Sequence, residues 1–281
     1  KEIPMSALPD GGFRMAEDGL HIWPRGQFML MALPNPGGSF TCSLFAPFEG
    51  EESFENVKSD KDVLSFFNKH FPDTVQHLPT LLEDWNSNPV SSLCSVKCYP
   101  WNINSRVAII GDAAHAIVPF FGQGMNSGFE DCTILSGLID GMAPSGEKDW
   151  CSLLDEYTRL RKPAGDAILD LALHNYIVMR DKTGNPEFLL QKRIEARIAS
   201  AHPDRWKPLY TLVTFSHIPY QDAWARGEMQ QAVMNEIMST KDIAQTWESA
   251  EIVAHAITLL DDYESGSKLL AHPTPLLSTD A

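Results

Sequence analysis

The stretch RVAIIGDAAHAIVPFFGQGMNSGFEDC, from Arg106 to Cys132, decides the fold of the central part of this chain. Its apolar run is short and ends at a Gly-Asp pair, as a fully buried parallel strand does. Residues 119–121 then form a loop of proline and phenylalanine, and residues 122–124 bring two glycines ahead of a helical pattern. The stretch therefore predicts a strand over 106–110, a tight turn and a following helix.

Each of these features suits a planar, electron-rich ring system such as a flavin. Glycine lets the backbone approach a flat ring closely because it has no Cβ. A helix start offers unpaired N–H groups and a positive dipole end to an electron-rich ring edge. A carboxylate at a strand end, here Asp112, accepts hydrogen bonds from sugar-like hydroxyls. The pattern therefore indicates a flavin site at this turn and helix start.

The same stretch carries motifs of a known family. Gly-Asp-Ala-Ala-His at 111–115, Gly-Gln-Gly-Met-Asn at 122–126 and Glu-Asp at 130–131 follow one another, with Pro119 between the first two. This arrangement resembles the second flavin-binding motif of the group A flavoprotein aromatic hydroxylases. Five strings then look like the kynurenine 3-monooxygenases within that group: LHIWP at 20–24, SFTCSLF at 39–45, VPFFGQGMNSGFEDC at 118–132, HNYIVM at 174–179 and PLYTLVTFS at 208–216.

The resemblance implies a mixed α/β (α+β) fold, that of the FAD-dependent aromatic hydroxylases. The fold is expected here in part, as an antiparallel substrate-domain sheet and a C-terminal helical domain. The implied reaction begins when NADPH reduces bound FAD and the reduced flavin takes up dioxygen. The resulting C4a-hydroperoxyflavin hydroxylates L-kynurenine to 3-hydroxykynurenine. Two alternatives stay open: a related hydroxylase with another aromatic substrate, and a non-catalytic remnant that binds an aromatic acid or a partner.

The resemblance also implies which residues meet the cofactor. Asp112 is expected to hold ribityl or ribose hydroxyls, while Met125 and Asn126 meet the isoalloxazine through backbone groups. No acid–base catalyst and no metal ligand is expected. The full expected cofactor set is Asp112, Gly122, Gln123, Gly124, Met125 and Asn126.

Substrate contacts follow from the same resemblance. Asn175 and Tyr210 match the family's polar contacts to the amino-acid end of kynurenine. Alternation along the predicted sheet independently places three members of the expected apolar wall on one face. That wall comprises Leu20, Met29, Met31, Leu33 and Phe45 from the sheet side, and Pro119, Phe120 and Phe121 with Gln123 from the flavin loop.

Ordinary structural roles stay open for several of these residues. A stripe of methionines is usually core packing. His115 has no partner carboxylate at a telling local spacing, so we expect a structural role for it rather than acid–base work. Asn175 also fits a satisfied polar group at an interface, and Tyr210 also fits a core tyrosine with a bonded hydroxyl.

The chain departs from the family in one respect. Family members begin with a Gly-x-Gly-x-x-Gly turn that cradles the FAD pyrophosphate. The nearest string here, Gly122-x-Gly124, follows a loop and is already assigned to the ring end of the flavin. We therefore expect roughly the second part of such an enzyme, which needs the N-terminal FAD-binding segment as a partner and binds FAD weakly or not at all by itself.

Composition limits the class of partner and the compartment. The chain has 281 residues and a formal charge of −15, which disfavours nucleic acids and anionic membranes as partners. No apolar run reaches the roughly 18–20 residues of a membrane span. Five cysteines without a Cys-x-x-Cys pair favour a reducing compartment. We expect a cytoplasmic protein, or attachment to the mitochondrial outer membrane if the full-length protein carries an anchor.

Periodicity predicts the remaining elements of the first hundred residues. Residues 20–48 alternate between turn signals and predict at least two antiparallel strands. A helix is expected over 61–71, capped by Ser59 or Asp60, and a weaker one over 74–85. Residues 91–99 predict a strand with two cysteines on one face, both as ordinary buried side chains rather than metal ligands.

Helical spacing dominates the rest of the chain. Apolar residues recur at helical intervals over 125–142 and 150–180, and Pro186 suits the first turn of a helix that runs towards Ala201. The expected organisation is a substrate-domain sheet with connecting helices, a returning part of the FAD-binding domain, and a C-terminal helical domain. The corresponding residue ranges are 1–100, 101–148 and 149–281.

Overall fold

The computed structural model describes residues 1–104, 106–142 and 149–270. The chain divides into two compact units, each of which is described by itself below: Lys1–Leu93 with Ile177–Asn185, and Cys94–Tyr176 with Pro186–Ala281. The division into three domains stays a prediction, and its boundary at 148 lies outside the described residues.

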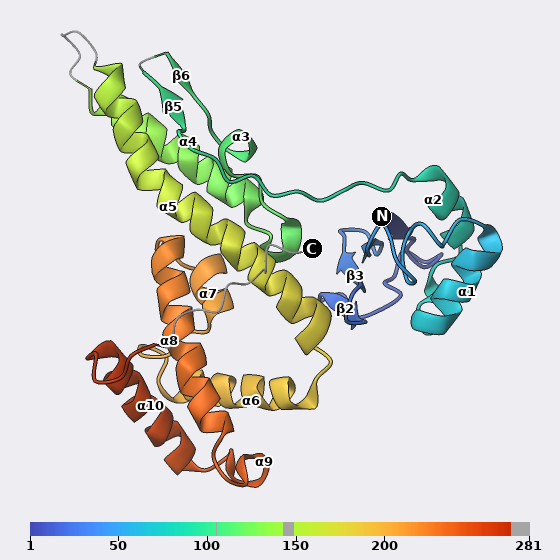
Figure 1. Cartoon of the computed structure of the whole chain (residues 1–281). Coiled ribbons are helices and arrows are strands. Elements are labelled where there is room, and N and C mark those ends of the chain that lie inside the picture. The colour runs from blue at the N-terminus through green and yellow to red at the C-terminus, as the bar shows by residue number, and fades with distance from the viewer. Residues whose placement is uncertain (105, 143–148, 271–281) are drawn as a thin grey trace. The chain divides into compact units, whose positions relative to one another are not determined.

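A four-stranded antiparallel sheet forms the first unit (Figure 1). The β3–β4 turn holds Gly37 and Gly38 at φ angles of 94° and 89°, which glycine adopts at little cost. The main-chain N–H of Asn35 closes this turn by donating to the carbonyl of Ser39 at 2.8 Å. The predicted antiparallel strands are therefore confirmed. In the spatial order β1-β4-β3-β2, they are β1 (Glu2–Met5), β4 (Phe40–Phe45), β3 (Met29–Pro34) and β2 (His21–Pro24).

Side chains of β3 alternate between two faces, as predicted. Leu30 and Ala32 belong to the hydrophobic core of the unit. Met29 and Met31, one position out of phase, are also buried but lie outside that core cluster, and Leu33 is 43% exposed. The sheet therefore has a packed inner face and an outer face whose exposure increases towards the end of β3.

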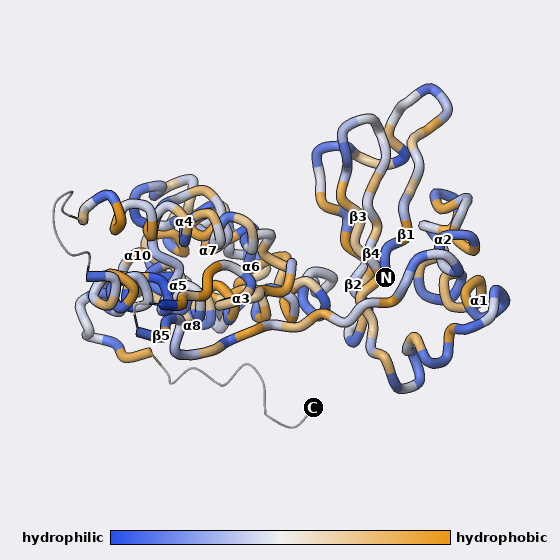
Figure 2. Tube along the Cα trace, turned by 90° about the horizontal axis from the view of Figure 1, so that it is seen from above, coloured by the Kyte–Doolittle hydropathy of each residue, from blue (hydrophilic) through white to orange (hydrophobic). Residues whose placement is uncertain are grey.

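Local sequence signals set the bounds of α1 (Asp60–His70). The hydroxyl of Ser59 accepts a hydrogen bond from the Asp62 N–H, and the Asp62 carboxylate accepts one from the Ser59 N–H at 2.9 Å. This reciprocal arrangement is a capping box, so the prediction of a helix capped at this point is confirmed. The helix α1 carries both polar and apolar residues (Figure 2), and its buried side chains are Val63, Phe66 and Phe67.

The weaker helix predicted over 74–85 is wrong as a single element. A short 3₁₀ turn, η1 (Val75–His77), precedes α2 (Leu81–Ser87). Pro79 separates them because it lacks an N–H and disfavours helical torsions in the residue before it. Leu78 accordingly has φ −114° and ψ 66°.

The strand predicted over 91–99 is also wrong. The Val96 N–H donates to the carbonyl of Ala116 at 2.9 Å, but no strand ladder runs along this segment of the described chain. Cys94 is exposed and Cys98 is half-buried, so they are not two buried side chains. A strand needs a neighbour that pairs with its backbone groups, and alternation in the sequence does not supply one.

Residues 106–110 do not form the buried parallel strand that their composition predicts. The segment contributes only β6 (Val107–Ala108), which pairs antiparallel with β5 (Asn102–Ile103) in a two-stranded sheet. Val107 is 53% exposed. An apolar run indicates a preference for burial, but the strands that would bury it must come from elsewhere in the sequence.

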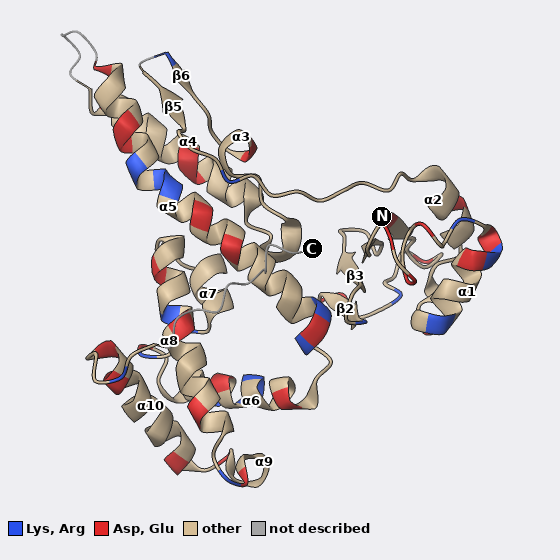
Figure 3. Cartoon of the chain, viewed as in Figure 1, with Lys and Arg blue, Asp and Glu red and all other residues tan. Residues whose placement is uncertain are grey.

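Helices make up most of the second unit (Figure 1). The helices predicted after Gly124, from Trp150 and from Pro186 are confirmed, and α5 carries side chains of both charges along its length (Figure 3). Trp206 lies in a core that α6, α8 and α10 share. The longer helices are α4 (Gly124–Asp140), α5 (Trp150–Ile177), α6 (Pro186–Ala201), α8 (Tyr220–Met238) and α10 (Ala250–Glu264); the shorter ones are α3 (Asp112–His115), η2 (Pro119–Phe121), α7 (Leu209–Thr214) and α9 (Ile243–Thr246).

The long helix α5 continues into a short π-helix, η3 (Val178–Lys182), which belongs to the first unit. There the carbonyl of Arg180 accepts a hydrogen bond from the N–H of Gly26 at 3.3 Å. None of the helices in the described ranges has both the length and the apolar character that crossing a membrane requires. An antiparallel sheet and many helices confirm the mixed α/β fold class.

Candidate functional site

Gly111 makes the turn that follows β6. Its φ of 60° and ψ of −140° form a backbone conformation that residues with a Cβ rarely adopt. The carbonyl of Gly111 accepts hydrogen bonds from the N–H groups of Ala114 and His115 at 2.8 and 3.0 Å, which starts α3. Asp112 is exposed, and its carboxylate bonds to no other residue in the described chain. The turn thus presents an uncommitted carboxylate.

The loop before α4 leaves the start of that helix open. Gly122 adopts the left-handed conformation at φ 68°, and Gln123 occupies the N-cap position without a side-chain cap. The N–H groups of Gly124, Met125 and Asn126 therefore lack the acceptors that helix interiors supply. Met125 is 76% exposed, which is unusual for such a large apolar side chain. Free amides and an exposed apolar side chain meet at one helix start.

The side chain of Gln123 links this helix start to α8. Its Oε1 accepts a hydrogen bond from Asn126 Nδ2 at 2.9 Å and lies 3.5 Å from the hydroxyl of Tyr220. Burial raises the pKa of Tyr220 to about 12, so the hydroxyl keeps its proton and serves as a donor. The contact joins the N-cap residue of α4 to the first turn of α8.

Aromatic stacking and one amide hold the η2 loop in place. Asn175 Nδ2 donates to the carbonyl of Phe120 at 2.7 Å, and the Phe120 ring stacks on Tyr176 with centroids 4.4 Å apart. Phe121 stacks on Tyr210 at 5.6 Å. The structure therefore brings both expected polar contacts to kynurenine beside the flavin loop. Their contact with substrate stays a prediction.

The expected apolar wall of the sheet lies in the first unit. Met29 and Met31 are buried, Phe45 is half-buried, and Leu20 and Leu33 are 47% and 43% exposed. Antiparallel pairing sets Met29 opposite Phe45. Their role in binding substrate stays a prediction.

A buried ion-pair network holds the Gly111 turn to α4 and α5. Asp131 is completely buried, and its Oδ1 accepts a hydrogen bond from Arg161 Nε at 2.7 Å. Its Oδ2 accepts one from the Gly111 N–H at 3.0 Å and lies 2.5 Å from His115 Nε2. Glu130 adds a second contact to the same guanidinium at 2.8 Å. One carboxylate thus joins three segments of the site.

Opposing effects act on the Asp131 carboxyl. Burial raises its pKa because the charged form loses hydration. Hydrogen bonds from His115, Arg161 and the Gly111 N–H outweigh burial and leave the pKa below its ordinary value of 3.8. Asp131 is therefore ionised, and the guanidinium of Arg161 supplies the opposite charge.

Local spacing gave no sign of this network. Asp131 follows His115 by 16 positions, and Arg161 follows Asp131 by 30. Opposite charges on two predicted helices were a weak signal, because helical phase shows which residues share a face but not which faces meet. The buried, bonded state of His115 agrees with the structural role expected for it.

Close packing surrounds the network. The rings of Trp101 and His115 lie 5.2 Å apart between centroids, and both are buried. A Cβ at Gly165 of α5 would lie 2.9 Å from Trp101 and 3.1 Å from His115. Glycine is therefore required at this point because the helix backbone approaches two buried rings.

We expect Gly165→Ala to lower the free energy of unfolding by about 1–3 kcal/mol, because the added methyl overpacks the rigid rings. Thermal and urea unfolding would measure the loss. Gly137→Ala is the matched control, since no atom lies within 4 Å of the added Cβ in α4. There the better helix propensity of alanine should stabilise the protein by about 0.5–1 kcal/mol. Equal effects of the two substitutions would contradict the packing argument.

Comparison with known proteins shows what this chain is similar to. Residues 92–172, which include the turn, the loop and α4, match the family described as FAD binding domain. A kynurenine 3-monooxygenase from Flavobacterium psychrophilum is 49% identical over 93% of this chain and 58% of its own length. One from Flavobacterium johnsoniae is 46% identical over 92% of this chain and 57% of its own length. The chain spans little more than half the length of these relatives.

A relative with lower sequence identity matches a similar share of the chain. The kynurenine 3-monooxygenase of Xanthomonas oryzae pv. oryzae is 40% identical over 91% of this chain and 56% of its own length. The resemblance to the flavoprotein aromatic hydroxylases, and among them to the kynurenine 3-monooxygenases, is therefore confirmed.

Proposed function

We propose that the polypeptide carrying this chain is an FAD- and NADPH-dependent monooxygenase that hydroxylates L-kynurenine to 3-hydroxykynurenine. The relatives that are 40–49% identical over more than nine-tenths of the chain are named kynurenine 3-monooxygenase. The observation that carries the proposal is the open start of α4, where unpaired amides adjoin an exposed methionine.

The residues at this helix start fit a flavin. A Cβ built on Gly111, Gly122 or Gly124 would meet no atom within 4 Å, so these backbone positions face open space. A planar ring can therefore approach the amides closely. Asp112 adds a free carboxylate at the preceding turn, within reach of sugar-type hydroxyls.

When bound, FAD supplies the redox chemistry that carries electrons from NADPH to dioxygen. The amides of Gly124, Met125 and Asn126 stabilise negative charge at the ring edge, with the α4 dipole acting in the same direction. Gly111, held by Asp131, orients the turn that presents Asp112. Because these donors are fixed before the ligand arrives, little reorganisation is needed when charge develops.

The side chains of Phe120 and Phe121 make the η2 loop apolar. Both are at least 93% buried, and each stacks on a tyrosine. Exclusion of water protects reactive intermediates from side reactions. Asn175 and Tyr210 lie at this loop and can orient the polar end of the substrate.

The test measures NADPH oxidation and product formation by the purified polypeptide supplied with FAD. We expect bound flavin absorbance, NADPH oxidation stimulated by L-kynurenine, and 3-hydroxykynurenine detected by mass spectrometry. Stimulation by a different aromatic acid without hydroxylation of kynurenine would replace the substrate assignment. Colourless protein without stimulation by either compound would overturn the enzyme proposal and favour a non-catalytic role.

A further inference from the structure

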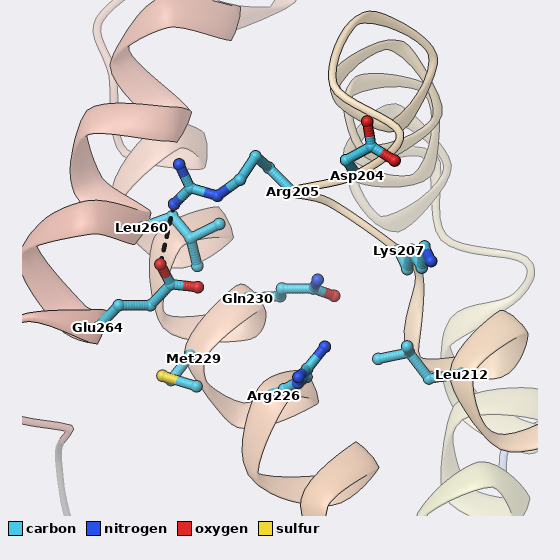
Figure 4. A pocket seen from close by; sticks show the side chains of 9 residues that line it. All are labelled: Asp204, Arg205, Lys207, Leu212, Arg226, Met229, Gln230, Leu260 and Glu264. Carbon is cyan, nitrogen blue, oxygen red and sulfur yellow. Dashed lines mark hydrogen bonds and ion pairs between the residues drawn. The ribbon is translucent and has the colours of Figure 1, made fainter. Parts of the chain in front are cut away.

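A small pocket lies among the C-terminal helices of the second unit (Figure 4). The connection between α6 and α7, together with α7, α8 and α10, forms its walls around a cavity of about 60 Å³. Arg205, Lys207 and Arg226 line it with cations, and Leu212 and Leu260 add apolar wall. Such a group of cations is notable in a chain with a net charge of −15.

Only one of the three cations is neutralised by the protein. Arg205 bonds to Asp261 at 2.6 Å and to Glu264 at 2.8 Å. Lys207 and Arg226 form no ion pair or hydrogen bond with any residue in the described ranges. Asp204 also lines the pocket without a partner there. Counted with Asp204, Asp261 and Glu264, the three cations are balanced in charge, so Lys207 and Arg226 contribute unused hydrogen-bond donors rather than excess charge.

Gln230 adds a side-chain amide without a protein partner to the same pocket. Its side chain is 9% exposed, lines the pocket and makes no hydrogen bond with the described chain. In Figure 4 its amide extends between Arg226 and Lys207. Its polar atoms are not among the fully buried side-chain atoms that lack a partner, so the amide reaches the open space of the pocket and is free to bond water or a ligand there.

We propose that this pocket binds a small oxyanion, the carboxylate or phosphate group of a metabolite. Arg226, Lys207 and the Gln230 N–H₂ supply donors, and charge-assisted hydrogen bonds to such oxygens are the stronger kind. A cavity of about 60 Å³ suits an anionic group rather than a whole nucleotide. The leucine walls lower the local dielectric and strengthen the attraction.

The first test titrates inorganic phosphate and acetate into the full chain by calorimetry, against sodium chloride at matched ionic strength. We expect saturable binding of at least one of the two anions, and the tighter one identifies the chemical group. Arg226→Gln and Lys207→Gln should each weaken that binding about tenfold, through loss of a charge-assisted hydrogen bond. Arg197→Gln is the matched control, because it removes the same charge from an exposed position on α6 outside the pocket.

A second variant separates recognition from general screening of charge. Gln230→Met removes the unpaired amide at similar volume. We expect a higher melting temperature without anion, and a smaller phosphate- or acetate-dependent shift than in the wild type. Absence of saturable binding of both anions, or equal weakening by Arg197→Gln and Arg226→Gln, would overturn the proposal. Flavin does not enter these measurements, so their outcome is independent of the monooxygenase activity.

Discussion

Replacing Asp131 with alanine is expected to lower the free energy of unfolding by about 3–5 kcal/mol, because Arg161 loses its buried counter-charge and keeps only the partly exposed Glu130. Arg161, 3% exposed, would keep its positive charge but lose the carboxylate at 2.7 Å. The Gly111 N–H would lose its acceptor as well. Thermal and urea unfolding of the second unit, followed by circular dichroism, measures the loss.

Asp140→Ala is the control for this prediction, since Asp140 lies exposed at the other end of the same helix. It should change the free energy of unfolding by no more than about 0.5 kcal/mol. If Asp131→Ala proved equally mild, the ion-pair network would not be what holds the turn to the two helices.

The pH dependence of the stability that Asp131 contributes gives a second check of its pairing with Arg161. The native pKa of Asp131 lies below its ordinary value of 3.8, so the folded state favours the ionised form. The stabilisation is therefore complete above the ordinary pKa and is lost as the pH falls through the lower native value. The difference between wild type and Asp131→Ala should shrink over that acidic interval. A difference that grows on acidification would contradict the assignment.

Elements set by local chemistry were predictable from sequence. The turn at residues 35–38 and the capping box at Ser59 act within a few positions, and both elements formed as expected. Residues 91–99 and 106–110 show the limit. Their alternating or apolar side chains are those of a half-buried or buried strand. A strand forms, however, only where neighbouring segments pair with its backbone.

In the candidate site, too, features set by neighbouring residues were predictable and contacts between distant residues were not. The free amides at the start of α4 follow from Gly122 and Gly124, which are two positions apart in sequence and whose conformations are local. The Asp131 network depends on which faces of α4 and α5 meet, and no short motif encodes that choice. Tyr220 was missed for the same reason, since its contact with Gln123 joins residues 97 positions apart.

Asp112 is expected to contribute to FAD binding but not to stability, whereas Asp131 contributes to stability. Because its carboxylate is exposed and bonds to no other described residue, Asp112→Ala should leave the melting temperature of the cofactor-free protein unchanged. If Asp112 holds flavin hydroxyls as proposed, its loss should weaken FAD binding about tenfold to a hundredfold, the range for hydrogen bonds to a charged acceptor. Titration of FAD against the polypeptide, followed by flavin fluorescence, measures this affinity.

The two aspartates therefore separate binding from stability. Asp140→Ala again serves as the control, since it removes the same charge from the same unit and should leave FAD affinity unchanged. If Asp112→Ala bound FAD as tightly as the wild type, the flavin hydroxyls would be held by other residues. If Asp140→Ala weakened FAD binding equally, the effect would come from net charge alone. A loss of affinity in Asp112→Ala alone, without any loss of stability, is expected only if the Gly111 turn presents this carboxylate to the cofactor.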